Sequence, residues 1–415
     1  MLVKFDDFYG ELGDIRVRKV KKYERIWKVQ YGGGADCISI KNNVAYVGCI
    51  DNYLYALDCE TGKEIWRFKT NGFVVDSKPV IENGKIFFGS FDTCFYALEE
   101  KTGKLLWRFR TGGEINSACA YDSGLIYFGS RDGYVYCVDE DKGKLLWQFK
   151  TGDEIISVPT IYDNKLFVGC ADGNLYCIDK NNGKELWRFK TGGEIFSLNP
   201  FLIHNGVIYF GSFDNYIRAL DIEKRKELWR FKTGNFGLAW SPFLHENKLY
   251  APSRDSIFYI LSLEGKELWR FRANGNIGSP SFYKNLVIIP SEDNNAYAVD
   301  INTKKEIWRF TAGNFLFFSS IWKDKIILPS ADCHVYCLEA ETGKLVWSFP
   351  TSVQYQPPLP PIEEEFEIEV ILSTKEDEGE KEEKYEPIAS VFEGSYAIKS
   401  EYTFISEYKQ KSEYK

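Results

Sequence analysis

Short apolar runs separated by polar turns recur along this chain with a period near 40 residues. In the second repeat the runs cover residues 76–81, 85–90, 94–98 and 105–110. The run at 85–90 is almost continuously apolar, which predicts a strand buried on both faces. The run at 105–110 ends in alternating aromatic and basic residues, which predicts a strand with one exposed face. Four short antiparallel strands per repeat form the blade of a β-propeller.

One tryptophan marks the fourth predicted strand of each repeat, at intervals of 39 to 42 residues. We expect each indole to wedge one blade against its neighbour. The eight structural docking tryptophans are Trp66, Trp107, Trp147, Trp187, Trp229, Trp269, Trp308 and Trp347. The sequence therefore predicts an all-β fold: an eight-bladed β-propeller of four-stranded antiparallel blades, with an acidic C-terminal appendage.

A ninth, isolated tryptophan raises the question of how the ring closes. Trp27 lies in a lone strand-like segment at residues 24–30, with no preceding strands of its own repeat. This segment either completes the last blade and displaces the Trp347 strand, or adds a fifth strand. Both alternatives leave eight blades.

Composition divides the chain into four predicted regions. Residues 1–22 form an N-terminal leader, 23–349 the propeller, 350–361 a Pro-rich linker, and 362–415 an acidic tail or small β appendage. Residues 350–415 carry 16 acidic residues and 7 lysines, whereas the remainder of the chain is nearly neutral. This charge does not indicate nucleic-acid binding.

The N-terminal residues lack the pattern of a signal peptide, and no apolar run reaches 18 residues, so we expect no membrane span and a cytoplasmic location. The ten cysteines fit this expectation. Cys137, Cys177 and Cys337 occupy a small-residue slot that holds Ala56 or Ala97 in other repeats. We therefore expect reduced structural thiols rather than disulfides or a metal site.

An aspartate follows the second predicted strand in all eight repeats. Eight acids at one loop position resemble a ring of cation ligands, but Asp also sets turns by bonding its own backbone two residues on. We favour the turn role. The set comprises Asp51, Asp92, Asp132, Asp172, Asp214, Asp255, Asp293 and Asp332.

The loops that lead into the first strands carry a second set of polar residues. In a propeller they ring the same face as the turn aspartates, at the mouth of the central channel. The last three repeats also have Pro in place of Gly before the turn, and extra aromatic residues. The candidate mouth residues are Glu114, Glu154, Glu194, Asn235, Trp240, Asn276 and Asn314, with Asp36 in the first repeat.

The pattern Ala-x-Asp-x-x-Thr-Gly-Lys-x-x-Trp, as in residues 56–66, resembles the tryptophan-docking motif of the pyrroloquinoline-quinone (PQQ)-type propeller repeat. Repeats five and seven depart from it, with Arg225 and Lys304 in place of the turn glycine. The family includes periplasmic quinoprotein dehydrogenases and non-catalytic scaffolds such as BamB. The resemblance implies for the dehydrogenases a PQQ and Ca²⁺ site, adjacent cysteines and an export signal. This chain has no adjacent cysteines. We carry over no catalytic, cofactor or metal residue.

Three functions follow as expectations. The first is a non-catalytic scaffold, monomeric and without a cofactor, that mediates protein–protein interaction with partners the sequence does not identify. The alternatives are small-ligand or glycan binding at the channel mouth, and a PQQ-dependent dehydrogenase. A mouth with acids, amides and a cation in contact would favour the dehydrogenase.

Overall fold

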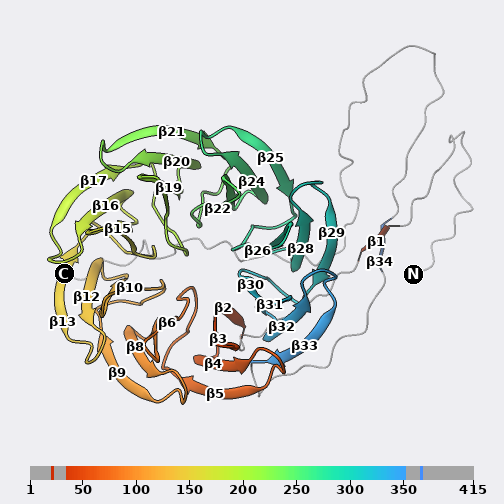
Figure 1. The fold of residues 1–415 in the computed structure, drawn as a ribbon, viewed down its shortest axis with the longest axis horizontal. Helices are drawn as coiled ribbons and strands as arrows, with labels where there is room; N and C mark the ends of the chain where they lie inside the picture. The colour runs from red at the N-terminus through yellow and green to blue at the C-terminus, as the bar shows by residue number, and fades with distance from the viewer. Residues whose placement is uncertain (1–19, 23–33, 352–364, 368–415) are drawn as a thin grey trace, which may run out of the picture. The chain divides into compact units, whose positions relative to one another are not determined.

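The computed structural model describes residues 20–22, 34–351 and 365–367. Residues 34–351 form eight four-stranded antiparallel sheets arranged around a central axis (Figure 1). Each sheet is built from consecutive strands, and the described residues contain no helix, hence none that could cross a membrane. The predicted eight-bladed β-propeller is confirmed. Predictions for residues 1–19, 23–33, 352–364 and 368–415 lie outside the described residues.

The first strand of each blade is innermost. Seven of these eight strands have only three residues. They are β2 (Ala35–Lys41), β6 (Val80–Glu82), β10 (Ala120–Asp122), β14 (Thr160–Tyr162), β18 (Leu202–His204), β22 (Phe243–His245), β26 (Ser281–Tyr283) and β30 (Ser320–Trp322).

The second and third strands form the core of each blade. Their side chains are buried on both faces, as the apolar runs predict; Phe87, Phe88 and Phe95 are fully buried. The second strands are β3 (Val44–Cys49), β7 (Lys85–Gly89), β11 (Leu125–Gly129), β15 (Lys165–Gly169), β19 (Val207–Ser212), β23 (Lys248–Pro252), β27 (Leu286–Pro290) and β31 (Lys325–Ser330). The third strands are β4 (Tyr53–Asp58), β8 (Cys94–Glu99), β12 (Tyr134–Asp139), β16 (Asn174–Asp179), β20 (Tyr216–Asp221), β24 (Ile257–Ser262), β28 (Asn295–Asp300) and β32 (His334–Glu339).

The fourth strands form the outer circumference (Figure 1). Along them, Trp and Phe turn inward while basic residues face solvent. An exposed strand edge invites pairing with another chain, and charge along it opposes that association. They are β5 (Glu64–Lys69), β9 (Leu105–Arg110), β13 (Leu145–Lys150), β17 (Glu185–Lys190), β21 (Lys226–Lys232), β25 (Glu267–Arg272), β29 (Glu306–Thr311) and β33 (Leu345–Pro350).

Each tryptophan lies opposite a small residue of the third strand in seven of the eight blades. Trp66 pairs with Ala56 and Trp147 with Cys137, and a one-residue register shift follows each pair. A small partner leaves room for the indole to turn toward the next blade. This pairing explains why cysteine replaces alanine in that slot. Nine of the ten cysteines are buried free thiols.

The indoles dock on the turn between the third and fourth strands of the next blade. Trp66 Nε1 donates to the Glu100 carbonyl at 3.1 Å. Its ring covers Gly103, where an added Cβ would lie 2.5 Å from the ring, and Gly103 also has a φ of +67°. The same hydrogen bond and covered glycine recur for Trp107, Trp147, Trp229, Trp308 and Trp347.

Two seams depart from this arrangement. Arg225 and Lys304 occupy the turn-glycine position of blades 5 and 7, with φ values of +55° and +62°. Within residues 34–351, the indole nitrogens of Trp187 and Trp269, which face these turns, make no hydrogen bond. Trp269 also lies opposite Ile260 rather than a small residue. The departure from the motif at two turns therefore has a structural counterpart at the same two seams.

The ring closes by the same contact that joins its other blades. Trp347, in β33, donates from Nε1 to the Cys59 carbonyl at 3.0 Å and covers Gly62 of blade 1. β33 is the fourth strand of the last blade. The alternative in which the Trp27 segment displaces the Trp347 strand is therefore wrong; the Trp27 segment itself lies outside the described residues.

A second unit of the chain joins its two terminal regions. β1 (Val20–Lys22) pairs antiparallel with β34 (Glu365–Glu367), with Lys21 opposite Phe366. A strand from the predicted leader and one from the predicted tail thus share a ladder, although they are separated by the whole propeller in the sequence.

Gly103→Ala tests the docking contact. The substitution strains a positive φ and forces a Cβ against the Trp66 ring, so we expect a loss of roughly 2–4 kcal/mol of unfolding free energy. Urea unfolding followed by tryptophan fluorescence measures the loss. Gly84→Ala is the matched control, because Gly84 has a φ of +72° and no atom within 4 Å of its Cβ position. Equal losses in the two variants would mean that the indole contact contributes nothing.

Arg225→Gly provides the opposite test. Arg225 has a left-handed backbone at a turn where six blades have glycine. Relief of that strain should raise the free energy of unfolding by roughly 0.5–1 kcal/mol. A lower urea midpoint in this variant would contradict the assignment of strain to this turn.

Candidate functional site

Two sets of loops meet on one face of the propeller. Six of the loops that follow a fourth strand donate a backbone N–H to the turn aspartate of the next blade: Asn71 N lies 2.9 Å from Asp92 Oδ2, and Gly112 N lies 2.7 Å from Asp132 Oδ2. Gly192, Gly234, Asn274 and Gly313 make the equivalent bond. The loops that carry most of the candidate mouth residues therefore lie on the same face as the turn aspartates.

Each turn aspartate organises its own turn. Oδ1 accepts the backbone N–H two residues on in all eight blades, as from Tyr134 to Asp132 at 3.0 Å. Oδ2 accepts a tyrosine hydroxyl four residues on in seven blades, and Arg218 replaces that tyrosine in the eighth. The predicted turn role is confirmed, since these carboxylates are used within the fold.

Glu114 and Glu154 lie on either side of Arg131. Arg131 Nε is 3.6 Å from Glu114 Oε2 and 3.9 Å from Glu154 Oε2, and it donates to Asn116 Oδ1 at 3.3 Å. The guanidinium also lies over the Phe91 ring. One arginine thus links the loops of two blades. Asn116 has no counterpart in the other repeats and Arg131 recurs only once, as Arg254, so the repeat pattern did not mark either residue as a mouth residue.

Glu194 extends this acidic region around the mouth. Burial raises its pKa, and the neighbouring carboxylates of Asp153 and Glu154 raise it further. We call Glu114, Asp153, Glu154 and Glu194 the acidic arc. Arg131 is the one basic side chain within 4 Å of an acidic-arc carboxylate in residues 34–351.

The amide candidates do not join the acidic arc. Asn235 is exposed. Asn276 donates to Glu292 Oε2 at 2.7 Å, and Asn314 accepts the Phe315 backbone N–H within its own turn. These residues mainly support local structure on the later blades.

Trp240 is buried rather than presented to solvent. It packs edge-to-face on Phe318, with ring centroids 5.1 Å apart, and both belong to a core cluster with Ala35 and Cys37 of blade 1. Residues from loops far apart in sequence thus meet in one apolar cluster. Trp240 fills space there, which its repeat position alone did not show.

A buried acid pair borders this apolar cluster. Asp36 Oδ2 accepts the Asp76 backbone N–H at 2.6 Å, and the Lys78 ammonium lies 4.7 Å from the centre of the Phe318 ring. Burial raises the pKa of Asp36 to about 6 and lowers that of Lys78 to about 8. Burial, followed by the Asp36 charge, raises the pKa of Asp76 well above its usual range. The loop between Trp66 and Ser77 is one residue longer than the equivalent loop of the third repeat, and this insertion could have drawn attention to Asp76.

Three exposed phenylalanines complete the mouth loops. Phe73, Phe236 and Phe315 are 41%, 72% and 39% exposed. Phe73 occupies the position that Glu114 occupies in the next loop. Exposed aromatic side chains beside polar groups are typical of surfaces that bind other molecules. The sequence did not identify these three residues, because apolar residues in loops next to strands are normally expected to be buried in the core.

The mouth therefore contains acids, an amide and basic side chains, but not in an arrangement that fits a metal-dependent cofactor. The contacts of Arg131 with Asn116 and Glu114 are the mixed chemistry expected to favour an enzyme. The described residues contain no group of three or more His, Cys, Asp or Glu side chains able to hold a metal ion. The Ca²⁺ set that a PQQ site needs is not formed by residues 34–351, and we derive no step through that cofactor.

The closed ring of eight blades defines this molecule as a β-propeller, and comparisons with known proteins agree. Residues 13–198 match the family model of the β-propeller of the beta-alanine-activating enzyme, and residues 213–356 match that of the outer membrane protein assembly factor BamB. The repeats and the match over residues 213–356 support the resemblance to the PQQ-type β-propeller repeat family, and each family model covers less than half of the chain. Among curated proteins, no sequence matches it significantly.

Solved structures support the fold. The computationally designed protein Ika8 is 17% identical, with a TM-score of 0.66 over 77% of this chain and 100% of its own. BamB from Moraxella catarrhalis is 13% identical, with a TM-score of 0.62 over 76% of this chain and 98% of its own. Both are similar to this chain in architecture.

Asp36→Asn tests the buried acid pair. A folded-state pKa raised to about 6 from 3.8 means that the folded chain holds its proton more tightly than the unfolded chain. The stabilisation of the fold by protonated Asp36 is present at low pH and is lost as the pH rises through 6. At about pH 8, Asp36→Asn should therefore be more stable than the native chain by up to roughly 2–3 kcal/mol. This difference in unfolding free energy should become small near pH 4.

Urea unfolding at both pH values measures this difference. Asp51 has a pKa raised in the same direction and is unchanged in the variant, so its contribution cancels. A variant less stable than the native chain at pH 8 would contradict an uncompensated buried charge at Asp36.

Proposed function

We propose that this propeller is a non-catalytic scaffold that binds a protein partner, and that its mouth receives a segment carrying basic and apolar side chains. The observation that supports this most directly is the acidic arc on the loops before blades 3 to 5, together with the three exposed phenylalanines on the equivalent loops before blades 2, 6 and 8. BamB, an outer membrane protein assembly factor, matches this chain over residues 213–356 and has a similar architecture.

Electrostatics favours a basic segment over an acidic one. The raised pKa of Glu194 reflects repulsion from Asp153 and Glu154 in addition to burial. An incoming lysine or arginine side chain relieves that repulsion, whereas an acidic segment adds to it. The acidic arc has one arginine among four carboxylates, so a second cation has favourable positions to occupy.

The exposed phenylalanines supply the apolar part of the contact. Phe236 is 72% exposed and Phe73 is 41% exposed. Aromatic anchors with a polar surround commonly dominate the binding energy of protein interfaces. The nine buried free cysteines fit a reducing compartment, which supports a cytoplasmic location for this interaction.

Fluorescence anisotropy with two labelled octapeptides tests the proposal. One peptide alternates arginine and leucine, and the other alternates glutamate and leucine. The arginine peptide should bind more tightly, and its affinity should fall with added salt because exposed charges are screened. Glu194→Gln should weaken binding about two- to fivefold, the range for one exposed charge, and Phe236→Ser should weaken it further.

Glu264→Gln is the matched control. Glu264 lies in the turn between β24 and β25, at the opposite end of the strands from the mouth, and the variant removes the same charge. Equal affinity of the two peptides, or an equal loss in Glu264→Gln and Glu194→Gln, would reject the mouth as the binding surface.

The mixed polar contacts around Arg131 favour a second candidate, the binding of a small polar ligand or glycan at the mouth. A thermal-shift screen with sugars and nucleotides distinguishes it from peptide binding.

Reconstitution with PQQ and Ca²⁺ followed by a dye-linked alcohol assay tests the dehydrogenase alternative.

A further inference from the structure

The basic residues of the outer strands are paired in most blades. In five blades, the residue two positions before the tryptophan is a glutamate that binds the arginine directly after the tryptophan. The N–O distances range from 2.5 to 3.7 Å in the pairs Glu64–Arg67, Glu185–Arg188, Glu227–Arg230, Glu267–Arg270 and Glu306–Arg309. In blade 2, Leu105 takes the place of that glutamate, so Arg108 has no acid on its own strand.

Blade 2 also lacks an aromatic ring at the start of its third strand. In blades 1 and 3, the basic residue three positions after the tryptophan lies over this ring: Lys69 over Tyr53 at 5.7 Å, and Lys150 over Tyr134 at 4.4 Å. Blade 2 has Cys94 at this position. The smaller side chain leaves a cavity of about 490 Å³, lined by Asn71, Asp92, Cys94, Arg108 and Arg110.

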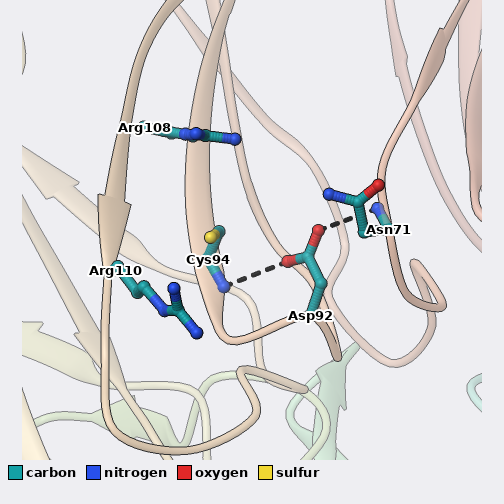
Figure 2. A pocket seen from close by; sticks show the side chains of 5 residues that line it. All are labelled: Asn71, Asp92, Cys94, Arg108 and Arg110. Carbon is teal, nitrogen blue, oxygen red and sulfur yellow. Dashed lines mark hydrogen bonds between the residues drawn. The ribbon is translucent and has the colours of Figure 1, made fainter.

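Two guanidinium groups border this cavity. Arg108 and Arg110 are two residues apart on β9, so their side chains leave the same face of the strand. Figure 2 shows them on the two sides of Cys94, with Asp92 and Asn71 across from them. Neither arginine has an ion pair or a side-chain hydrogen bond within residues 34–351.

The one carboxylate in the cavity is already occupied. Asp92 Oδ1 accepts the Cys94 N–H at 3.0 Å, and Oδ2 accepts the Asn71 N–H at 2.9 Å and the Tyr96 hydroxyl at 2.6 Å. Asp92 makes these bonds in its turn, as its equivalents do, and it forms no ion pair with either arginine. The cavity therefore has two unpaired cations and one carboxylate whose oxygens are engaged.

We propose that the blade-2 pocket binds a phosphate monoester. A guanidinium donates two parallel N–H bonds to an oxyanion, and a phosphate has enough oxygens to meet both Arg108 and Arg110. The volume of the pocket exceeds that of a phosphate group, which leaves room for the organic part of the ligand. The phosphate comes from a small phosphorylated metabolite or from a phosphorylated side chain of a protein. Asn71 and Asp92 lie in loops on the mouth face, but none of the candidate mouth residues lines the pocket, and this proposal does not rest on the proposed function.

Isothermal titration calorimetry of the full chain with O-phosphoserine, glucose 6-phosphate and a phosphoserine hexapeptide tests the proposal. Saturable binding of at least one probe is expected, with serine, glucose and the unphosphorylated peptide inactive. Arg108→Gln should lower affinity about tenfold or more, which is the range for a lost charge-assisted hydrogen bond. If all three probes bind, the site recognises the phosphate group alone. If the phosphopeptide is the only probe that binds, the phosphate comes from a phosphorylated protein.

Two further variants separate the pocket from nonspecific attraction. Cys94→Tyr introduces the tyrosine that blades 1 and 3 have at this position. Its ring should fill the pocket and abolish binding, although both arginines are still present. Leu105→Glu restores the glutamate of the five paired blades and should lower affinity by engaging Arg108. Arg188→Gln on blade 4 removes the same charge from a paired arginine and should leave binding unchanged. Urea midpoints confirm that each variant is folded.

The proposal is overturned if no probe binds the native chain, if folded Cys94→Tyr and Leu105→Glu both bind as the native chain does, or if Arg188→Gln loses as much affinity as Arg108→Gln.

Discussion

The contact on which this propeller depends is an indole of one blade held against the turn of the next. Each complete contact combines an Nε1 hydrogen bond to a backbone carbonyl with a ring that lies over a glycine. Six of the eight seams have both parts, including the seam between Trp347 and blade 1 that closes the ring. Because the last seam has the same contact as the five other complete seams, closure in the described residues needs no exchange of strands between the two ends of the repeat array.

The docking contact explains several features that look unrelated in the sequence. The turn glycine is required because a Cβ would strike the indole and because its φ is positive. The alanine or cysteine opposite the tryptophan is small because the indole turns away from its own sheet. At the seam of Trp269, both conditions fail: Ile260 lies opposite the ring and Lys304 occupies the turn. The indole nitrogen makes no hydrogen bond at that seam within residues 34–351.

Candidate binding surfaces arise where the repeat is broken. The blade-2 pocket exists because Leu105 and Cys94 replace a glutamate and a tyrosine, which leaves Arg108 and Arg110 without side-chain partners in residues 34–351. At the mouth, the loops of blades 3 to 5 carry acids, while the loop before blade 2 carries Phe73 at the same position. A regular propeller would present eight copies of one surface; these substitutions give each region of the ring its own chemistry.

The sequence by itself determined the architecture, because the period of the tryptophans and the strand patterns depend on local spacing that every blade repeats. It also identified the role of the turn aspartates, which bond to atoms two and four residues away. Only the tertiary structure decided which mouth residues meet. Arg131 joins Glu114 to Glu154, Asp36 bonds to Asp76, and Trp240 packs against blade 1, all across loops at least fifteen residues apart. Such contacts depend on how the ring closes, and no local pattern encodes them.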